Sequence, residues 1–160
     1  MTINSKLNKL IVSSKELYHR LVLIVGEKNA CSRIIHETAE SYGKQPININ
    51  LDLSEKLLQL NHKKRQLKLQ NLMWNLVKDE KEIVFLTDTE ILFDSSLQQD
   101  PLKILQEVSR NIRVVAYWGG EVNNTKLVYA IPNHSEYREY SSNDVVFINT
   151  EGKTSFELDC

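Results

Sequence analysis

Two short runs of apolar residues constrain the fold of this chain more than any other feature of its sequence. Leu21–Val25 reads Leu-Val-Leu-Ile-Val, and Ile83–Leu86 reads Ile-Val-Phe-Leu. A strand with one face in water alternates apolar and polar side chains, whereas neither run contains a polar residue. Runs of this length are typical of strands buried on both faces. We therefore expect a central sheet that is covered by helices on both sides.

The segments around these runs predict helices and strands in alternation. The spacing of Leu7, Leu10, Ile11 and Leu17 predicts an amphipathic helix over 4–18. Strands that alternate with helices imply parallel βαβ units with right-handed crossovers, so we expect one α/β domain over 1–160 with a mainly parallel sheet and a β-rich C-terminal end. The remaining expected elements are helices over 31–42, 53–58, 69–76 and 99–110, strands over 46–51, 113–118 and 126–131, and a C-terminal hairpin over about 144–158.

Length and charge restrict the class of protein. The 160 residues fit one domain, since two would leave about 80 residues for each core. With 20 basic and 21 acidic residues the net charge is -1, so attraction to nucleic acid would need a local patch. No apolar run approaches the ~20 residues of a membrane span, and the polar start is unlike a signal peptide. We expect a cytoplasmic protein that does not contact a membrane. Cys31 and Cys160 lie too far apart in sequence to indicate a zinc site.

Gly26 stands directly after the first apolar run, where the phosphate-binding loop of a nucleotide-binding α/β protein begins. The pattern G-x-x-x-x-G-K-[ST], placed on residues 26–33, keeps only this glycine. Cys31 occupies the second glycine position, Ser32 the lysine position and Arg33 the hydroxyl position. The missing lysine contact to phosphate is worth ~1.5–3 kcal/mol, and the missing hydroxyl removes a magnesium ligand. The sequence thus predicts a P-loop NTPase-like three-layer sandwich with a degenerate phosphate loop.

Two interpretations of residues 26–33 stay open. In the first, the segment is a structural turn from strand to helix and no cofactor is required. In the second, it binds ATP and magnesium weakly, with Gly26 and Ser32 in the loop and with Lys28 or Arg33 in place of the missing lysine. A helix N-terminus attracts an anion through its free N–H groups in either case.

The second apolar run ends in acidic residues. Asp88 follows it closely and Glu90 comes two residues later, which resembles the strand of a nucleotide hydrolase that positions magnesium and polarises water. Asp88 is the candidate magnesium ligand and Glu90 the candidate base, and both are candidate catalytic residues. The alternative is that Asp88 caps a short helix that begins at Thr89.

One concentrated basic run lies between the two helices expected in the middle of the chain. It comprises His62, Lys63, Lys64 and Arg65, and Lys68 follows closely. Such a run is usually a solvated bend between helices. The alternative is contact with DNA or with an acidic partner, and that binding would depend strongly on salt.

Three segments carry a family resemblance: Leu92–Gln106, Asn111–Ala116 and Pro132–Tyr137. With their Leu-Gln-Gln-Asp-Pro-Leu stretch and His-x-Glu-Tyr element, they make the chain similar to BrxF, the small P-loop proteins of type 3 BREX bacteriophage-exclusion systems, over most of residues 17–148. The resemblance implies a cytosolic bacterial component of a multi-protein defence system that acts with a DNA methyltransferase and other subunits. It also implies a P-loop, but Cys31, Ser32 and Arg33 differ from the residues that a P-loop has at these positions.

Together these observations favour a subunit that serves as scaffold or adaptor in an anti-phage complex, with little or no ATPase activity. One alternative is an ATP- or GTP-binding switch with a rebuilt phosphate loop. Another is a module that contacts DNA through the basic run at 62–68. Self-association is compatible with all three.

Overall fold

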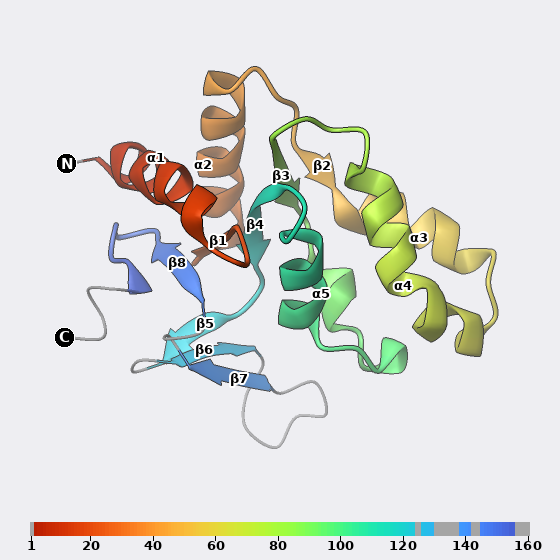
Figure 1. Ribbon diagram of the computed structural model, residues 1–160. Coiled ribbons are helices and arrows are strands. Elements are labelled where there is room, and N and C mark those ends of the chain that lie inside the picture. The colour runs from red at the N-terminus through yellow and green to blue at the C-terminus, as the bar shows by residue number, and fades with distance from the viewer. Residues whose placement is uncertain (1, 124–125, 130–137, 142–144, 156–160) are drawn as a thin grey trace.

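The computed structural model describes residues 2–123, 126–129, 138–141 and 145–155, and its helices surround a five-stranded sheet (Figure 1). The helical segments are α1 (Ile3–Ser13), η1 (Ser14–Glu16), α2 (Lys28–Ser41), α3 (Ile49–Leu58), α4 (His62–Val77), η2 (Glu90–Phe93), η3 (Ser95–Leu97) and α5 (Pro101–Val108). The strands are β1 (Leu21–Val25), β2 (Ile47–Asn48), β3 (Ile83–Thr87), β4 (Arg113–Trp118), β5 (Glu121–Asn123), β6 (Lys126–Tyr129), β7 (Arg138–Ser141) and β8 (Val146–Asn149).

The central sheet has the order β2-β3-β4-β1-β8, and every neighbouring pair in it is parallel. In the register, Leu23 of β1 lies between Ala116 of β4 and Phe147 of β8. All residues of β1, β3 and β4 are buried, which confirms the prediction from the apolar runs. A parallel α/β sandwich of this kind is compatible with both Rossmann-like and P-loop-like folds.

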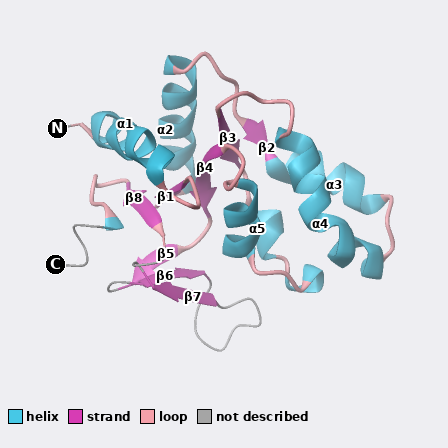
Figure 2. Cartoon of the chain, in the orientation of Figure 1, coloured by secondary structure: helices cyan, strands magenta, loops and turns pink. Residues whose placement is uncertain are grey.

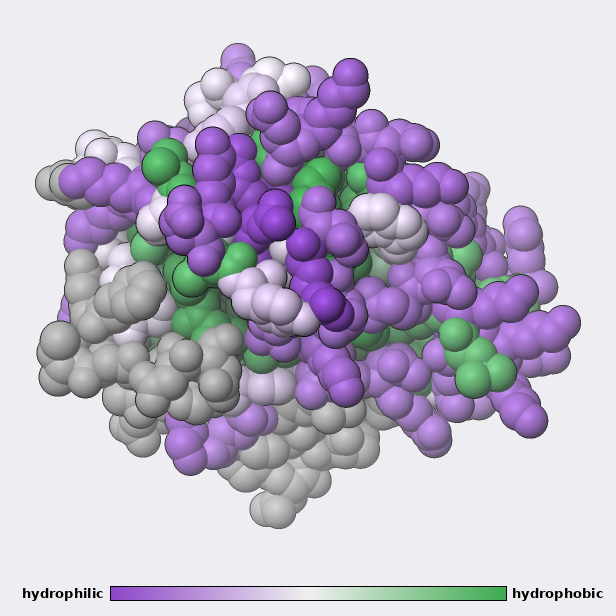
Figure 3. All heavy atoms as spheres, viewed as in Figure 1, coloured by the Kyte–Doolittle hydropathy of each residue, from purple (hydrophilic) through white to green (hydrophobic). Residues whose placement is uncertain are grey.

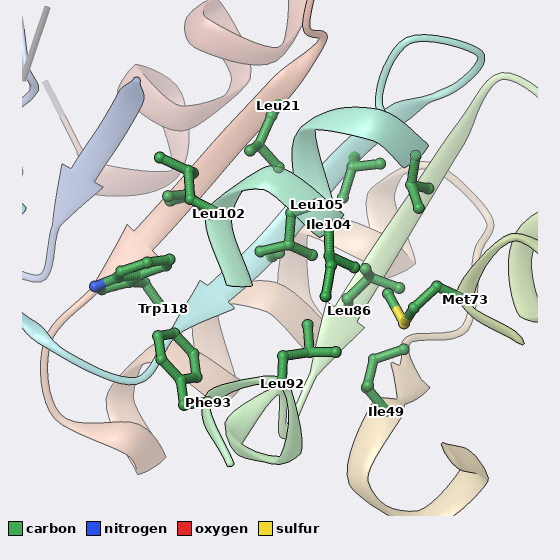
Figure 4. Close-up of a cluster of buried hydrophobic side chains, with 14 of the residues drawn as sticks. Leu21, Ile49, Met73, Leu86, Leu92, Phe93, Leu102, Ile104, Leu105 and Trp118 are labelled. Carbon is green, nitrogen blue, oxygen red and sulfur yellow. The ribbon is translucent and has the colours of Figure 1, made fainter. Parts of the chain in front are cut away.

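Helices cover both faces of this sheet, as Figure 2 shows for the elements drawn in cyan and magenta. On one face, α1 and α2 pack on alternate strand residues such as Val22, Ile24 and Phe85. On the other, α3, α4 and α5 pack on the residues between them. The outer surface seen in Figure 3 is mostly hydrophilic, with hydrophobic side chains in small patches between the helices. Figure 4 shows the larger core, where Leu105 and Met73 come from helices that lie over the strand carrying Leu86.

A second, antiparallel sheet follows β4, with the order β5-β6-β7. It is joined to the main core by Trp118, the last residue of β4, whose indole Nε1 donates to the carbonyl of Val128 at 3.1 Å. Trp118 also meets the ring of Phe93 edge-on, as Figure 4 shows. The β-rich character expected for this region is therefore present in its described part.

Three expected boundaries differ from the structure for local reasons. The N-terminal helix expected over 4–18 ends at Ser13, because Ser14–Glu16 tighten into a 3₁₀ turn and Leu17 is extended. The strand expected over 46–51 covers only Ile47–Asn48, since the Asn48 side chain accepts from the N–H of Leu51 and starts α3. In the region of the expected hairpin, β8 joins the parallel sheet and only one antiparallel bridge, Ile148 to Thr154, is formed by the described residues.

None of the helices formed by the described residues is long and apolar enough to cross a membrane.

Candidate functional site

The candidate site lies at the edge of the sheet where the parallel strands end. The strands β1 and β4 are neighbours, but the chain leaves β1 into α2 on one face and leaves β4 toward the small sheet on the other. In open α/β sheets, ligands bind in the crevice outside the strand ends at such a switch point. Gly26 follows β1 and Asp88 follows β3 at this edge.

The turn from β1 to α2 is shorter than a phosphate loop. Only Gly26 and Glu27 separate Val25, the last residue of β1, from Lys28, the first residue of α2. Gly26 has φ 144°, a conformation that favours glycine, and its α-carbon faces the side chain of Thr150. A phosphate loop needs several residues whose N–H groups surround the anion. The structure therefore favours the first interpretation of residues 26–33, a structural turn.

The N-terminus of α2 is occupied by a side chain of the protein itself. The Glu27 carboxylate accepts from the N–H of Asn29 at 3.0 Å and from the N–H of Ala30 at 2.7 Å. These two hydrogen bonds, with a smaller contribution from Arg33, hold the pKa of Glu27 below its ordinary value. The N–H groups that would receive a phosphate are already bonded to a carboxylate.

The residues expected in the loop after Ala30 are helical. The helix was expected to begin at residue 31 but begins at Lys28, so Cys31, Ser32 and Arg33 lie inside α2. Cys31 is buried, and burial raises the pKa of its thiol to about 12. The carbonyl and hydroxyl of Ser32 lie near Nδ1 of His36, at 2.8 and 3.4 Å, on the exposed side of the helix. Ser32 and Arg33 therefore lie in the second turn of α2 and not in the turn that precedes the helix.

Lys28 connects the two acidic residues that follow β3. Its ammonium Nζ lies 2.9 Å from Oδ1 of Asp88 and 3.0 Å from Oε1 of Glu90. The Lys28 side chain is 50% exposed, and those of Asp88 and Glu90 are 26% and 30% exposed. The pKa of Lys28 is raised by Asp88 and then by Glu90. The structure thus brings together three of the predicted site residues, but it pairs them with one another.

Asn50 fixes the position of the acidic segment, and sequence reasoning missed it. Its Nδ2 donates to Oε2 of Glu90 at 2.7 Å, and its Oδ1 accepts from the N–H of Ile91 at 2.7 Å. The N–H of Asn50 donates to the carbonyl of Asp88 at 2.8 Å. Three hydrogen bonds that involve Asn50 therefore hold the segment from Asp88 to Ile91 against the start of α3.

The alternative role proposed for Asp88, a helix cap, is wrong. Asp88 has φ 51°, in the left-handed region, and the following short helix begins at Glu90 with Thr89 before it. Thr89 instead donates from its hydroxyl to the carbonyl of Tyr117 at 2.6 Å. The N–H of Ile91 in that helix donates to Asn50 and not to Asp88, whose carboxylate instead pairs with Lys28.

The residues at the strand ends do not fit the magnesium that a P-loop would bind. Magnesium takes carboxylate, hydroxyl and water oxygens, whereas the Asp88 carboxylate is bonded to an ammonium and the hydroxyl position is Arg33 in a helix. Within the part of the chain that the structure describes, no three His, Cys, Asp or Glu side chains gather as a metal site would require. A shallow hollow of about 340 Å³ lies beside Asp88, lined mainly by Asn48, Asn50 and Ser54.

The basic run is not a bend between helices. Asn61 caps α4 by accepting from the N–H of Lys64 at 2.9 Å, so the helix begins at His62 and includes the whole run. Within it, Arg65 turns back and donates from Nε to the carbonyls of Leu57 at 2.7 Å and Leu60 at 3.0 Å. Arg65 thereby closes the end of α3, while Lys63, Lys64 and Lys68 are exposed.

Sequence reasoning missed the Glu27 cap of α2 and the contacts of Asn50, and each of them leaves a weak local signal. Glu27 directly precedes the first helical residue, and a carboxylate at that position favours a helix N-terminus. Asn48 and Asn50 follow Pro46 where a strand was expected, and asparagine is depleted in strands and favoured at helix caps. No family model, no curated protein and no solved structure matches the chain.

Proposed function

We propose that this chain is a P-loop NTPase-like subunit whose phosphate site is closed by its own side chains, and that it serves as scaffold or adaptor in a bacterial anti-phage complex of the type 3 BREX kind. The fold supports the first part of the proposal, since a parallel sheet with β1 in its interior leads through Gly26 into a helix. The second part depends on the resemblance of residues 17–148 to BrxF.

The observation that carries the proposal is the Glu27 carboxylate on the N-terminus of α2. A nucleotide phosphate needs the same N–H groups, so it would have to displace a hydrogen-bonded anion that is covalently part of the turn. An intramolecular group competes at a high effective concentration, which a free ligand at cellular levels does not reach easily. The hydrogen bonds of Glu27 at the start of α2 therefore support a site that is closed to phosphate.

The charges at the strand ends also disfavour the binding of a nucleotide. Two carboxylates, those of Asp88 and Glu90, pair with the ammonium of Lys28, and the carboxylate of the preceding residue, Glu27, occupies the start of the same helix. To reach a phosphate, Lys28 would have to leave both of its partners, and the triphosphate would approach the carboxylates thus released. Like charges at close range repel, and the effect is stronger in a partly desolvated site.

What the closed site retains supports the scaffold role. Ion pairs and the Asn50 hydrogen bonds join α2, α3 and the end of β3 into one rigid edge. Such an edge preserves the shape of a nucleotide-binding fold without its cycle of binding and hydrolysis. We propose that the cytoplasmic partners of this subunit are the other proteins of the defence system, a DNA methyltransferase among them.

Thermal melting with and without Mg-ATP, Mg-GTP and ADP tests the closed site. A ligand at a hundred times its dissociation constant adds ~2.7 kcal/mol to stability, which raises the melting temperature of a domain of this size by roughly 5–10 °C. We expect no rise with any of the three nucleotides. The variant Glu27→Gln is the matched comparison, since it removes the competing charge and keeps the size of the side chain. A rise of several degrees in the unmodified protein would contradict the proposal.

A phage-exclusion assay tests the adaptor role in cells that carry a complete defence system. Deletion of the chain should abolish exclusion, whereas Asp88→Asn, which keeps the size of the side chain and removes its charge, should retain it. Loss of exclusion in a stably folded Asp88→Asn variant would instead support a nucleotide-dependent switch.

A further inference from the structure

The outward face of α4 concentrates positive charge. The helix carries Lys63, Lys64, Arg65 and Lys68, and it contains no aspartate or glutamate. The three lysines are exposed, whereas Arg65 is engaged with the end of α3. The net charge of the whole chain is only -1, so this face differs from the rest of the surface.

Two large apolar side chains are exposed on the same helix. Leu67 is 72% exposed and Trp74 is 37% exposed. They are seven residues apart, which places them on one side of α4 and about 10 Å from each other along its axis. Lys63 lies one turn before Leu67, and the exposed Lys78 lies one turn after Trp74. Lysines therefore stand at both ends of a line that carries these two apolar side chains, with the polar residues Gln70 and Asn71 between them.

The stability of α4 does not account for this pattern. Cations in the first turn oppose the helix dipole by about 0.3–1 kcal/mol each, and no acidic residue in that turn offsets them. The buried side of the helix already supplies its packing through Leu69, Met73 and Val77. In Figure 3, the surface over α4 is hydrophilic except for a small hydrophobic patch. An apolar centre with a charged rim is the usual composition of a protein interface.

We propose that this face of α4 docks an acidic amphipathic helix of a partner protein. Leu67 and Trp74 pack against the apolar side of that helix, and Lys63, Lys64, Lys68 and Lys78 pair with carboxylates along its flanks. The inference rests on the proposed adaptor function and names the surface and the partner chemistry through which it would act. Tryptophan at the centre of an interface commonly contributes a large share of the binding energy.

Nucleic acid fits this face less well. Contacts to a phosphate backbone come from cations and polar groups, whereas the line between the lysines is occupied by Leu67 and Trp74. The exposed carboxylate of Asp79 also follows the helix directly, and Glu80 after it pairs with Lys44, so a polyanion that extends past the end of α4 would meet a negative charge at Asp79.

Binding is measured by tryptophan fluorescence with synthetic peptides of about 18 residues, long enough to cover α4. The chain has two tryptophans, and Trp118 is fully buried, so a shift of emission on binding reports on Trp74. The first peptide has leucine at helical spacing with glutamate on both flanks. The second has lysine in place of each glutamate, and the third has serine in place of each leucine. A mixed-sequence DNA duplex of about 20 base pairs is the fourth probe.

We expect saturable binding of the first peptide with a Kd of about 100 μM or tighter at low salt, a blue shift of emission, and at least tenfold weaker binding of the other peptides. Leu67→Ser and the pair Lys63→Glu with Lys64→Glu should each weaken binding at least tenfold. The matched controls on α3, Leu58→Ser and Lys56→Glu, should leave it unchanged, since both residues are exposed there.

Three results would overturn the inference: no saturable binding of the first peptide below about 1 mM, no effect of Leu67→Ser, or tighter binding of the duplex with loss only in the lysine variants. The last result would assign the face to nucleic acid. This face of α4 does not include Glu27, Lys28 or their partners. The nucleotide melting experiment can therefore contradict the closed site without affecting the docking inference, and the peptide titration can contradict the docking inference without affecting the closed site.

Discussion

Replacement of Lys28 by methionine should destabilise the protein chiefly by leaving two carboxylates unpaired. The ammonium of Lys28 lies about 3 Å from both Asp88 and Glu90, so the two carboxylates lie within about 6 Å of one another. Methionine has nearly the same length and no charge. Lys28→Met therefore removes two ion pairs and uncovers a repulsion, with little change in packing.

The size of the effect follows from distance and exposure. Partly exposed ion pairs contribute about 0.2–1 kcal/mol each, and screening by solvent places these near the middle of that range because Lys28 is half exposed. Two charges 6 Å apart repel by about 0.7 kcal/mol in water and about 2.8 kcal/mol at an effective dielectric constant of 20. We expect a total loss of about 1–3 kcal/mol, which lowers the melting temperature by roughly 3–9 °C.

Calorimetry or thermal melting at several salt concentrations measures this loss. The deficit of Lys28→Met should be largest at low salt. It should shrink in about 1 M salt, where the screening length falls to ~3 Å.

A double-mutant cycle decides whether repulsion is the cause. Glu90→Gln should destabilise the unmodified protein, because it removes an ion pair, but should stabilise Lys28→Met by about 1 kcal/mol, because it removes the repulsion. The glutamine carbonyl can still accept from Asn50, so this contact is kept in both backgrounds. An equal effect of Glu90→Gln in the two backgrounds would refute the reasoning.

Four further outcomes follow from the structure. Asn50→Ala should cost about 1–3 kcal/mol in denaturant unfolding, since it leaves the N–H of Ile91 and one carboxylate oxygen of Glu90 without their partner. Gly26→Ala should cost more than about 2 kcal/mol, because φ is 144° and the new Cβ would lie 2.7 Å from a methyl of Thr150; Thr150→Ala should restore only the part due to that contact. Stability should fall as pH rises above about 9, since burial raises the pKa of Cys31 from 9.0 and of Tyr117 from 10.0 to about 12, and the unfolded chain loses these protons first; a stability unchanged from pH 8 to 11 would contradict this. In a Cys160→Ser background, Cys31 should react with a thiol reagent at pH 8 only after unfolding, and rapid reaction of the folded protein would show that the thiol is accessible.

The sequence predicted the central strands well because burial on both faces leaves a clear local signal. The bounds expected for Leu21–Val25 and for 113–118 coincide with β1 and β4. The elements at the edge of the sheet were less predictable. Residues 46–51 alternate apolar and polar side chains as an edge strand would, but Asn48 caps a helix after only two strand residues.

The candidate site was predicted in its location but not in its connections. Gly26, Lys28, Asp88 and Glu90 all lie at the strand ends, as the parallel topology requires. The pairing of Lys28 with carboxylates some sixty positions later is a tertiary contact that no local pattern contains. The helix start was misplaced because the spacing of the phosphate-loop pattern was imposed on a turn of two residues.

The central claim is that the N–H groups at the start of α2 are bonded to Glu27 and closed to phosphate. Two-dimensional ¹⁵N–¹H NMR of the labelled protein, titrated with Mg-ATP to millimolar concentration, observes the amides of Asn29 and Ala30 directly. We predict that neither amide signal moves, in contrast to Glu27→Gln, where both N–H groups become more available to an anion. A progressive, saturating displacement of these two signals in the unmodified protein would contradict the account.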